Sequence, residues 1–212
     1  MYTVFLAGGI ASGKSTVARL IEGHGAMRID LDQVSRDVCR PGGDIEGDLV
    51  EAFGDDLVDP ETGELDRALL AARAFVSDDS RRLLEGIEMP AIKAELTRQL
   101  TDVPCCATRP DVCVVEIPLL DRVIDLIPLA DEVMAVTCPL RARRVRAQGR
   151  GMDAADFDRR VSAQPSDAYL CEHADTIIDN TGTESALVLA VDAWWRSRAK
   201  GGWKSVPGGM LS

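Results

Sequence analysis

The sequence predicts a doubly wound α/β fold in which five parallel strands alternate with helices. Short apolar runs alternate along the chain with segments whose apolar residues recur at i, i+3 and i+4, the pattern of successive βαβ units. The run Val112–Glu116 is apolar without alternation, as in a strand covered on both faces. Polar candidate residues follow the expected strands at their carboxyl ends, where ligands bind to sheets of this kind.

The expected strands are short apolar runs that favour extended backbone. They are Tyr2–Ala7, Met27–Asp30, Val112–Glu116, Asp131–Thr137 and Asp175–Asp179. The expected helices follow from apolar spacing and from the Gly and Pro residues near their ends. They are Lys14–Glu22, Asp32–Cys39, Ile45–Phe53, Arg67–Phe75, Asp79–Leu100, Leu140–Gln148, Asp153–Ala163 and Glu184–Arg198. Pro90 is expected to kink or divide its helix, because proline removes a backbone hydrogen bond.

The sequence suggests a single unit over residues 1–200, made of three parts. We expect a core from 1–32, 111–140 and 174–200, a helical region over about 33–110, and an arginine-rich segment over about 141–165. The last stretch, 201–212, has four glycines, one proline and no periodicity, which predicts a disordered tail.

Composition excludes several classes of protein. The 212 residues carry a net charge of −11, which argues against binding to nucleic acid. The chain has no apolar run near the ~18 residues that span a membrane and no secretory signal. The six cysteines include no C-x-x-C pair, which argues against a zinc site. We expect reduced thiols, Cys105 and Cys106 included, and a cytoplasmic location.

The segment Gly8–Thr16 matches G-x-x-x-x-G-K-[ST] between the first expected strand and the first expected helix, the context of a P-loop. Its candidate nucleotide-binding residues are Gly8, Gly9, Ile10, Ala11, Ser12, Gly13, Lys14, Ser15 and Thr16. Backbone amides and a helix N-terminus bind phosphates in this arrangement. Lys14 is expected to reach the β- and γ-phosphates, and the Ser15 hydroxyl to bind Mg²⁺.

Carboxylates follow the second strand and end the third. Asp30 and Asp32 are two residues apart, so in an extended strand both would face the same side, toward the P-loop. Asp32 is the candidate base that takes the proton of an acceptor hydroxyl; alternatively, it caps a helix that starts at Gln33. Glu116 either lies near Mg²⁺, with water between them, or makes a structural hydrogen bond.

Basic residues are unevenly distributed, because the whole chain has four lysines whereas one short segment is rich in arginine. The arginines of that segment are Arg141, Arg143, Arg144, Arg146, Arg150, Arg159 and Arg160. Such a cluster suits a small polyanion. The alternative is a solvated helix face that pairs with Asp153, Asp156 and Asp158. Asn180, after the last strand, either lies beside an adenine base or belongs to a simple turn.

Further motifs occur in a fixed order after the P-loop. They are Ile29-Asp30-Leu31-Asp32, Ser35-Arg36, Gly63-Glu64-Leu65-Asp66-Arg67, Pro90-Ala91-Ile92, Ile117-Pro118-Leu119-Leu120, Gln164 and Ile177-Ile178-Asp179-Asn180-Thr181-Gly182. With the P-loop, this set resembles the dephospho-coenzyme A kinase family over about residues 1–195. That family transfers the γ-phosphoryl group of ATP to the ribose 3′-hydroxyl of dephospho-CoA, the last step of coenzyme A synthesis.

The resemblance implies a role for each part of the chain. Asp32 would be the base, residues 33–110 would hold the acceptor and 141–165 would form a lid. In this scheme the catalytic residues are Asp32, Lys14, Arg143 and Arg146, the acceptor-binding residues are Asp32, Arg36, Leu119 and Leu120, and Asn180 contacts the nucleotide.

The expected substrates are ATP, with Mg²⁺, and dephospho-CoA. We expect no nucleic-acid or membrane partner and a monomer or weak oligomer. The family usually has a histidine where this chain has Met89, so a nucleotide or nucleoside kinase with a different acceptor is the alternative.

Overall fold

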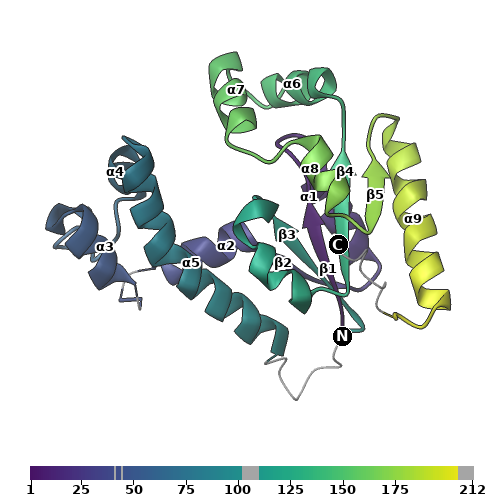
Figure 1. Ribbon diagram of the computed structural model, residues 1–212, viewed down its shortest axis with the longest axis horizontal. Coiled ribbons are helices and arrows are strands. Elements are labelled where there is room, and N and C mark those ends of the chain that lie inside the picture. Colours follow the sequence, from purple (N-terminus) through teal and green to yellow (C-terminus); the bar gives the residue numbers. More distant parts are fainter. Residues whose placement is uncertain (41, 44, 102–109, 205–212) are drawn as a thin grey trace. The chain divides into compact units, whose positions relative to one another are not determined.

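Figure 1 presents a computed structural model, which describes residues 1–40, 42–43, 45–101 and 110–204. The chain divides into two compact units: Met1–Asp30 with Cys105–Ser212, and Leu31–Pro104. The second unit overlaps the helical region expected over residues 33–110. Cys105 and Cys106, which are expected to be reduced thiols, lie outside the described residues.

The first unit is built on a parallel sheet, as predicted, with the strand order β2-β3-β1-β4-β5 in the described chain. Its strands are β1 (Tyr2–Ala7), β2 (Met27–Asp30), β3 (Val112–Ile117), β4 (Glu132–Thr137) and β5 (Thr176–Asp179). Every residue of β1 is buried. Ala7 lies opposite both Ile117 and Ala135, so the carboxyl ends of the three central strands share one edge. The segments that follow these strands therefore meet at that edge.

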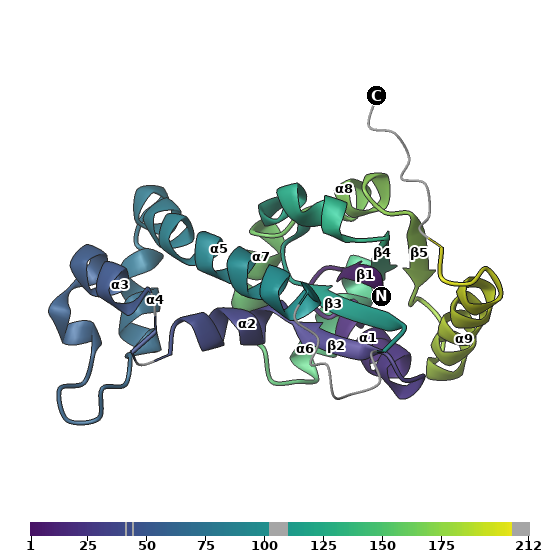
Figure 2. The ribbon, with the colours of Figure 1, turned by 90° about the horizontal axis from the view of Figure 1, so that it is seen from below.

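Helices cover both faces of this sheet (Figure 1 and Figure 2). On one face, α1 (Lys14–Gly23) and α9 (Glu184–Lys200) pack over a core that includes Leu6, Met134 and Val191. On the opposite face, α8 (Asp167–Glu172) contacts β4. The other helices of this unit are α6 (Leu140–Gln148), α7 (Ala154–Ser162), η2 (Leu120–Arg122) and η3 (Ile124–Leu129). Sequence analysis missed α8, η2 and η3, because so few turns carry little apolar periodicity.

The second unit is helical and has a core of its own. Its elements are α2 (Leu31–Val38), α3 (Glu46–Phe53), η1 (Asp55–Leu57), α4 (Arg67–Ala74) and α5 (Asp78–Thr101). Leu49, Leu57 and Ala74 are fully buried in that core. The helix α5 continues through Pro90, so the expected division there is wrong. Leu84 before the proline and Ile92 after it are both buried, and burial of such apolar side chains stabilises the helix against the lost hydrogen bond.

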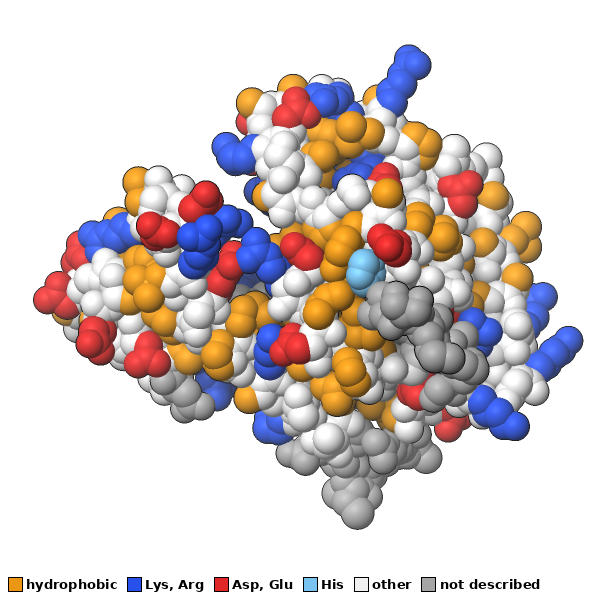
Figure 3. Space-filling view, viewed as in Figure 1, with side chains coloured by type: hydrophobic (Ala, Val, Ile, Leu, Met, Phe, Trp, Pro, Cys, Tyr) orange, Lys and Arg blue, Asp and Glu red, His pale blue; other side chains and the backbone are white. Residues whose placement is uncertain are grey.

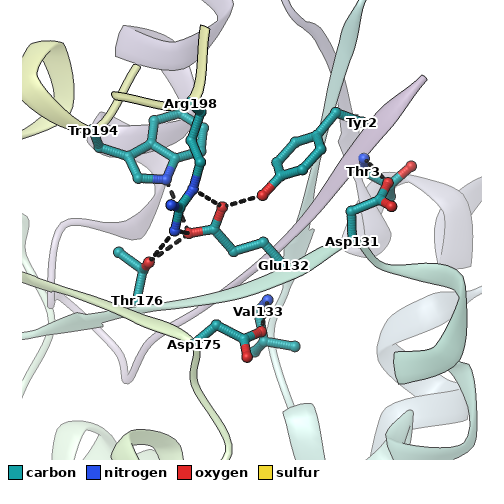
Figure 4. A network of polar contacts seen from close by, with 9 residues as sticks. All are labelled: Tyr2, Thr3, Asp131, Glu132, Val133, Asp175, Thr176, Trp194 and Arg198. Atoms are coloured by element: carbon teal, nitrogen blue, oxygen red, sulfur yellow. Dashed lines mark hydrogen bonds and ion pairs between the residues drawn. The ribbon is translucent and has the colours of Figure 1, made fainter. Parts of the chain in front are cut away.

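A buried carboxylate ties the last helix to the sheet, as Figure 4 shows. Glu132 of β4 is 1% exposed. Its two oxygens accept hydrogen bonds from Tyr2 Oη at 2.6 Å, from Trp194 Nε1 at 3.0 Å and from the Thr176 hydroxyl. The Arg198 guanidinium donates two more, each of 2.8 Å. These contacts connect β1, β4, β5 and α9 through one side chain.

The charge on Glu132 is stabilised by its partners. Burial raises the pKa of Glu132, but the hydrogen bonds from Arg198, Thr176, Tyr2 and Trp194 together lower this pKa below its ordinary value of 4.5. A carboxyl whose pKa is lower in the folded protein stabilises the fold most fully above its unfolded pKa. That contribution is lost as the pH falls through the folded pKa.

The first residues of the stretch 201–212, for which a disordered tail is expected, lie within the described part of the chain. Trp203 is half-buried, and its ring lies 4.6 Å from that of Trp195 and 5.5 Å from that of Tyr2. Aromatic packing therefore orders the chain as far as Trp203. Residues 205–212 lie outside the described part.

The exposed surface has two further features. On the face drawn in Figure 3, Lys and Arg side chains lie among Asp and Glu side chains. Over the described residues, no helix combines the length and the apolar character needed to cross a bilayer.

We predict that Glu132→Gln lowers the free energy of unfolding by about 3 kcal/mol at neutral pH, because it leaves Arg198 without its buried counter-charge. Denaturant unfolding followed by circular dichroism measures this, with the exposed Glu51→Gln in α3 as control. The difference between wild type and Glu132→Gln should shrink as the pH falls below 4.5, since protonation removes the same charge. Equal stability at pH 7 would contradict the assigned role of Glu132.

Candidate nucleotide-binding site

The P-loop has the position and the backbone shape that the sequence predicts, between β1 and α1. The Ser12 amide donates to Gly9 O at 3.0 Å and closes a four-residue turn, and the Thr16 and Val17 amides return to Gly13 O as α1 begins. Gly13 has a φ of +104°, which L side chains rarely adopt. A Cβ on Gly13 would lie 2.1 Å from Asn180 Nδ2, so both the backbone angle and the space require glycine there.

The turn also contains a residue in the left-handed region that is not glycine. Ala11 has a φ of +58°, a conformation that costs an L residue about 1 kcal/mol. Such strain persists where the surroundings hold the backbone in place. Side chains from distant parts of the sequence contact this turn.

Arg143 and Gln164 hold the residue before Ala11. The Arg143 side chain is 5% exposed, and its Nε donates to Ile10 O at 2.8 Å. Its Nη1 donates to Asp167 Oδ1 at 2.9 Å. From the opposite direction along the backbone, the Ile10 amide donates to Gln164 Oε1 at 2.7 Å. Gln164 belongs to the set of motifs that carries the family resemblance, but no pattern in the sequence indicates its contact with Ile10.

Asn180 and Arg146 hold the Ser12 carbonyl of the loop. The Asn180 side chain is buried, and its Nδ2 donates to Ser12 O at 2.6 Å. Arg146 donates from Nη1 to the same Ser12 O at 3.3 Å and from Nη2 to Asn180 O at 2.9 Å. Asn180 is thus built into the P-loop wall. A contact between Asn180 and the adenine base stays a prediction.

Three of the remaining arginines of the cluster form the ion pairs that the helix-face alternative describes, and binding of a polyanion by the cluster stays a prediction. Arg144 pairs with Asp158, and Arg159 and Arg160 pair with Asp156. These pairs form the helix face that the simpler alternative described. Arg143 and Arg146, two of the seven arginines of the cluster, contact the loop directly.

Lys14 and Ser15 both contact the carboxyl end of β3. Lys14 Nζ donates to Ile117 O at 3.0 Å, and the Ser15 hydroxyl donates to Glu116 Oε2 at 2.7 Å. Glu116 is 3% exposed and also accepts hydrogen bonds from Nε of Arg28, at 2.7 Å, and from its Nη2. Of the two alternatives for Glu116, the structure therefore contains the hydrogen bond. Sequence analysis missed Arg28, although a buried carboxylate in β3 implies a cationic partner nearby.

The donor set beside Ser15 fits a magnesium ion that arrives with a nucleotide. Mg²⁺ prefers oxygen ligands and usually keeps several waters beside one or two protein groups and substrate phosphates. The Ser15 hydroxyl and the Glu116 carboxylate supply such oxygens within 2.7 Å of each other. The described residues contain no cluster of three or more His, Cys, Asp or Glu that could hold a metal on its own.

Two expectations about Asp32 are wrong. The strand β2 ends at Asp30 and α2 begins at Leu31, so the alternation of an extended strand does not relate Asp30 to Asp32. Since α2 starts before Gln33, Asp32 lies within the first helical turn and does not precede it. Asp32 is exposed, and its role as a base stays a prediction.

The expected acceptor contacts have the following positions. Arg36 is exposed in α2, and its guanidinium donates to Gln33 Oε1 at 2.8 and 3.0 Å. Leu119 is half-buried, whereas Leu120 is 1% exposed and belongs to the core. The roles of Arg36, Leu119 and Leu120 in acceptor binding stay predictions.

We predict that Gly13→Ala weakens ATP binding by about tenfold or more, because the new methyl displaces Asn180 and strains the backbone. Titration calorimetry with a non-hydrolysable ATP analogue measures the affinity. Gly23→Ala, at the other end of α1, is the matched control, since a Cβ there meets nothing within 4 Å. If Gly13→Ala bound the analogue as tightly as Gly23→Ala, the loop would not be the phosphate site.

Comparison with known proteins identifies the family to which the chain is similar. A family model described as dephospho-CoA kinase matches residues 2–185. A dephospho-CoA kinase of Corynebacterium efficiens is 40% identical, over 91% of this chain and 94% of that protein. A crystal structure of TT1252 from Thermus thermophilus has a TM-score of 0.76 and 26% identity, over 92% of this chain and 97% of that one. A dephospho-CoA kinase from Campylobacter jejuni has the same fold, with a TM-score of 0.70 at 22% identity, over 94% and 98% of the two chains. The chain therefore belongs to the dephospho-CoA kinase family.

Proposed function

We propose that this chain transfers the γ-phosphoryl group of ATP to the ribose 3′-hydroxyl of dephospho-CoA and so forms coenzyme A. Membership of the family over residues 2–185 supports the reaction. The observation that carries it is the P-loop, with Lys14, Ser15 and Glu116 together at the carboxyl edge of the sheet. The alternative, a kinase with a different acceptor, is not favoured by these findings.

Binding of the triphosphate is assigned to the loop amides and the N-terminus of α1, which attract anions. Lys14 would exchange its hydrogen bond with Ile117 O for phosphate oxygens. Arg143 and Arg146 already lie against Ile10 O and Ser12 O, so their positive charge is next to the loop. Phosphoryl transfer depends mainly on positioning and on stabilising negative charge, which these groups supply.

Ser15 and Glu116 are the residues that would hold Mg²⁺. Arg28 holds Glu116 Oε1, which leaves Oε2 directed to the Ser15 hydroxyl. When bound there, Mg²⁺ would neutralise charge on the phosphate oxygens during transfer. The Ser15 hydroxyl and the Glu116 carboxylate are already hydrogen-bonded to each other in the structure.

The acceptor side of the reaction is assigned mainly to the second unit, Leu31–Pro104, which includes Asp32. Asp32 follows β2 by two residues, and β2 is paired with the strand that carries Glu116. Asp32 is our proposed base for the 3′-hydroxyl, and Arg36, Leu119 and Leu120 are proposed acceptor contacts. Residues 33–110 would bind the acceptor.

The arginine-rich segment 141–165 is proposed as the lid that closes over ATP. Its helix α6 already carries two side chains to the P-loop, and Gly149 and Gly151 separate α6 from α7. A lid excludes water and so limits hydrolysis of ATP. The monomeric or weakly oligomeric state, the cytoplasmic location and the absence of other partners stay predictions.

The reaction itself is tested by offering the wild-type protein and ATP four acceptors: dephospho-CoA, adenosine, AMP and dCMP. ADP release should be greatest with dephospho-CoA, and mass spectrometry with phosphorus NMR should place the new phosphate on the 3′-oxygen. Lys14→Ala should reduce the rate on the order of 10³-fold or more, because it removes a phosphate clamp. Faster transfer to AMP, dCMP or adenosine would overturn the proposed acceptor.

We predict that Asp32→Asn reduces turnover by roughly 10² to 10⁴-fold and leaves ATP affinity nearly unchanged, since asparagine keeps the shape but cannot take a proton. Single-turnover transfer to dephospho-CoA measures the rate. Asp37→Asn in the same helix is the matched control, because Asp37 is exposed and its carboxylate accepts a hydrogen bond from Gln33. Transfer by Asp32→Asn at the rate of Asp37→Asn would move the search for the base to Asp30 or Glu116.

A further inference from the structure

Both backbone polar groups of Ile10 are bonded to side chains that lie more than 130 positions away in the sequence. The amide donates to Gln164 Oε1 at 2.7 Å, and the carbonyl accepts from Arg143 Nε at 2.8 Å. Asp167 completes the arrangement, because its Oδ1 accepts from Arg143 Nη1 at 2.9 Å. Gln164 and Asp167 belong to one short stretch between α7 and the first turn of α8.

The residue held in this way precedes the strained position of the loop. In the turn Gly9–Ser12, Ile10 and Ala11 are the two central residues. Among the described non-glycine residues, only Ala11 and Trp203 have a positive φ, so Ile10 has a negative one. A negative and then a positive φ is the pattern of a type II turn, which favours glycine at the second central position. With alanine there, the turn lacks the residue type that would stabilise it alone.

Types I and II differ in the orientation of the central peptide, here the bond between Ile10 and Ala11. This peptide is trans, so its carbonyl and its N–H point in opposite directions. Since Arg143 holds Ile10 O, the Ala11 amide points away from that guanidinium. A flip of the peptide would break the hydrogen bond to Arg143 and reverse the Ala11 amide. The direction of one P-loop donor therefore depends on what holds Ile10.

We propose that Gln164 is a positioning residue for nucleotide binding: it holds the Gly9–Ile10 peptide while Arg143 holds the Ile10–Ala11 peptide that follows, so that Ile10 is fixed from both sides and the Ala11 amide is directed to the phosphates. The inference rests on the proposed use of ATP. Gln164 fixes the amide on one side of Ile10, Arg143 fixes the carbonyl on the other, and Asp167 orients Arg143. The stretch 164–167 thereby links the end of the proposed lid segment to the shape of the phosphate site.

A double-mutant cycle tests this role. The four proteins are wild type, Gln164→Ala, Ala11→Gly and the double variant, each titrated calorimetrically with a non-hydrolysable ATP analogue. Gln164→Ala should weaken binding by about tenfold, the equivalent of one positioning hydrogen bond. In the Ala11→Gly background the same change should weaken binding by less than about threefold, because glycine adopts the positive φ without support.

Two further variants exclude a simple packing effect. Gln164→Leu keeps the size of the side chain but removes the acceptor, so it should bind the analogue as weakly as Gln164→Ala. It also replaces Gln164→Ala in the cycle if that variant fails to fold. Leu189→Ala, at a side chain of similar size that is exposed in α9, should bind like wild type.

The outcomes separate this proposal from the proposed function. Wild-type affinity in Gln164→Leu, or an equal loss in the alanine and glycine backgrounds at position 11, would overturn the positioning role. Transfer to dephospho-CoA is measured on the same wild-type preparation. If that transfer were absent while the cycle behaved as expected, the proposed acceptor would fail and the role of Gln164 in nucleotide binding would stand.

Discussion

The central constraint in this molecule is that the backbone of the P-loop does not hold its own shape. The turn Gly9–Ser12 contains a left-handed alanine, and the helix that follows begins at a left-handed glycine. Buried backbone carbonyls also need partners, because an unpaired one costs about as much as a lost hydrogen bond. Side chains that follow β4 and β5 supply both the support and the partners. The strand order makes this possible, since β4 is next to β1 and β5 is next to β4.

Two buried carboxylates of the sheet show that the role of a charge depends on its hydrogen-bond partners. Glu132 pairs with Val4, near the start of β1, and Glu116 pairs with Leu6, near its end. Glu132 accepts five hydrogen bonds, so both of its oxygens are occupied by the protein. The two oxygens of Glu116 are divided between Arg28 and the Ser15 hydroxyl, which a metal ion can displace. The first carboxylate therefore serves stability, whereas the second is suited to chemistry.

Much of the fold could be predicted from local signals. The strands are short runs of apolar residues. The P-loop motif is expected between a strand and a helix, so it predicts both of these neighbours. The partner of a buried polar group is a different matter, because it depends on which segments the fold brings together. Arg28 and Gln164 each contact a residue far along the chain, and neither contact has a sequence period. The expected orientation of Asp32 is wrong for a local reason. The helix α2 begins directly after Asp30, so the alternation of side chains along β2 does not extend to Asp32.

The arginine cluster shows why two interpretations of one segment need not exclude each other. In a helix, residues three apart share a face, whereas neighbouring residues point about 100° apart. Arg143 and Arg146 are three apart and both reach the P-loop, while Arg144 points to Asp158 in α7. One helix thus presents one row of cations to the P-loop and another cation to the helix beside it. In a chain of net charge −11, the first row concentrates positive charge where a polyanion would bind. The second contact joins α6 to α7.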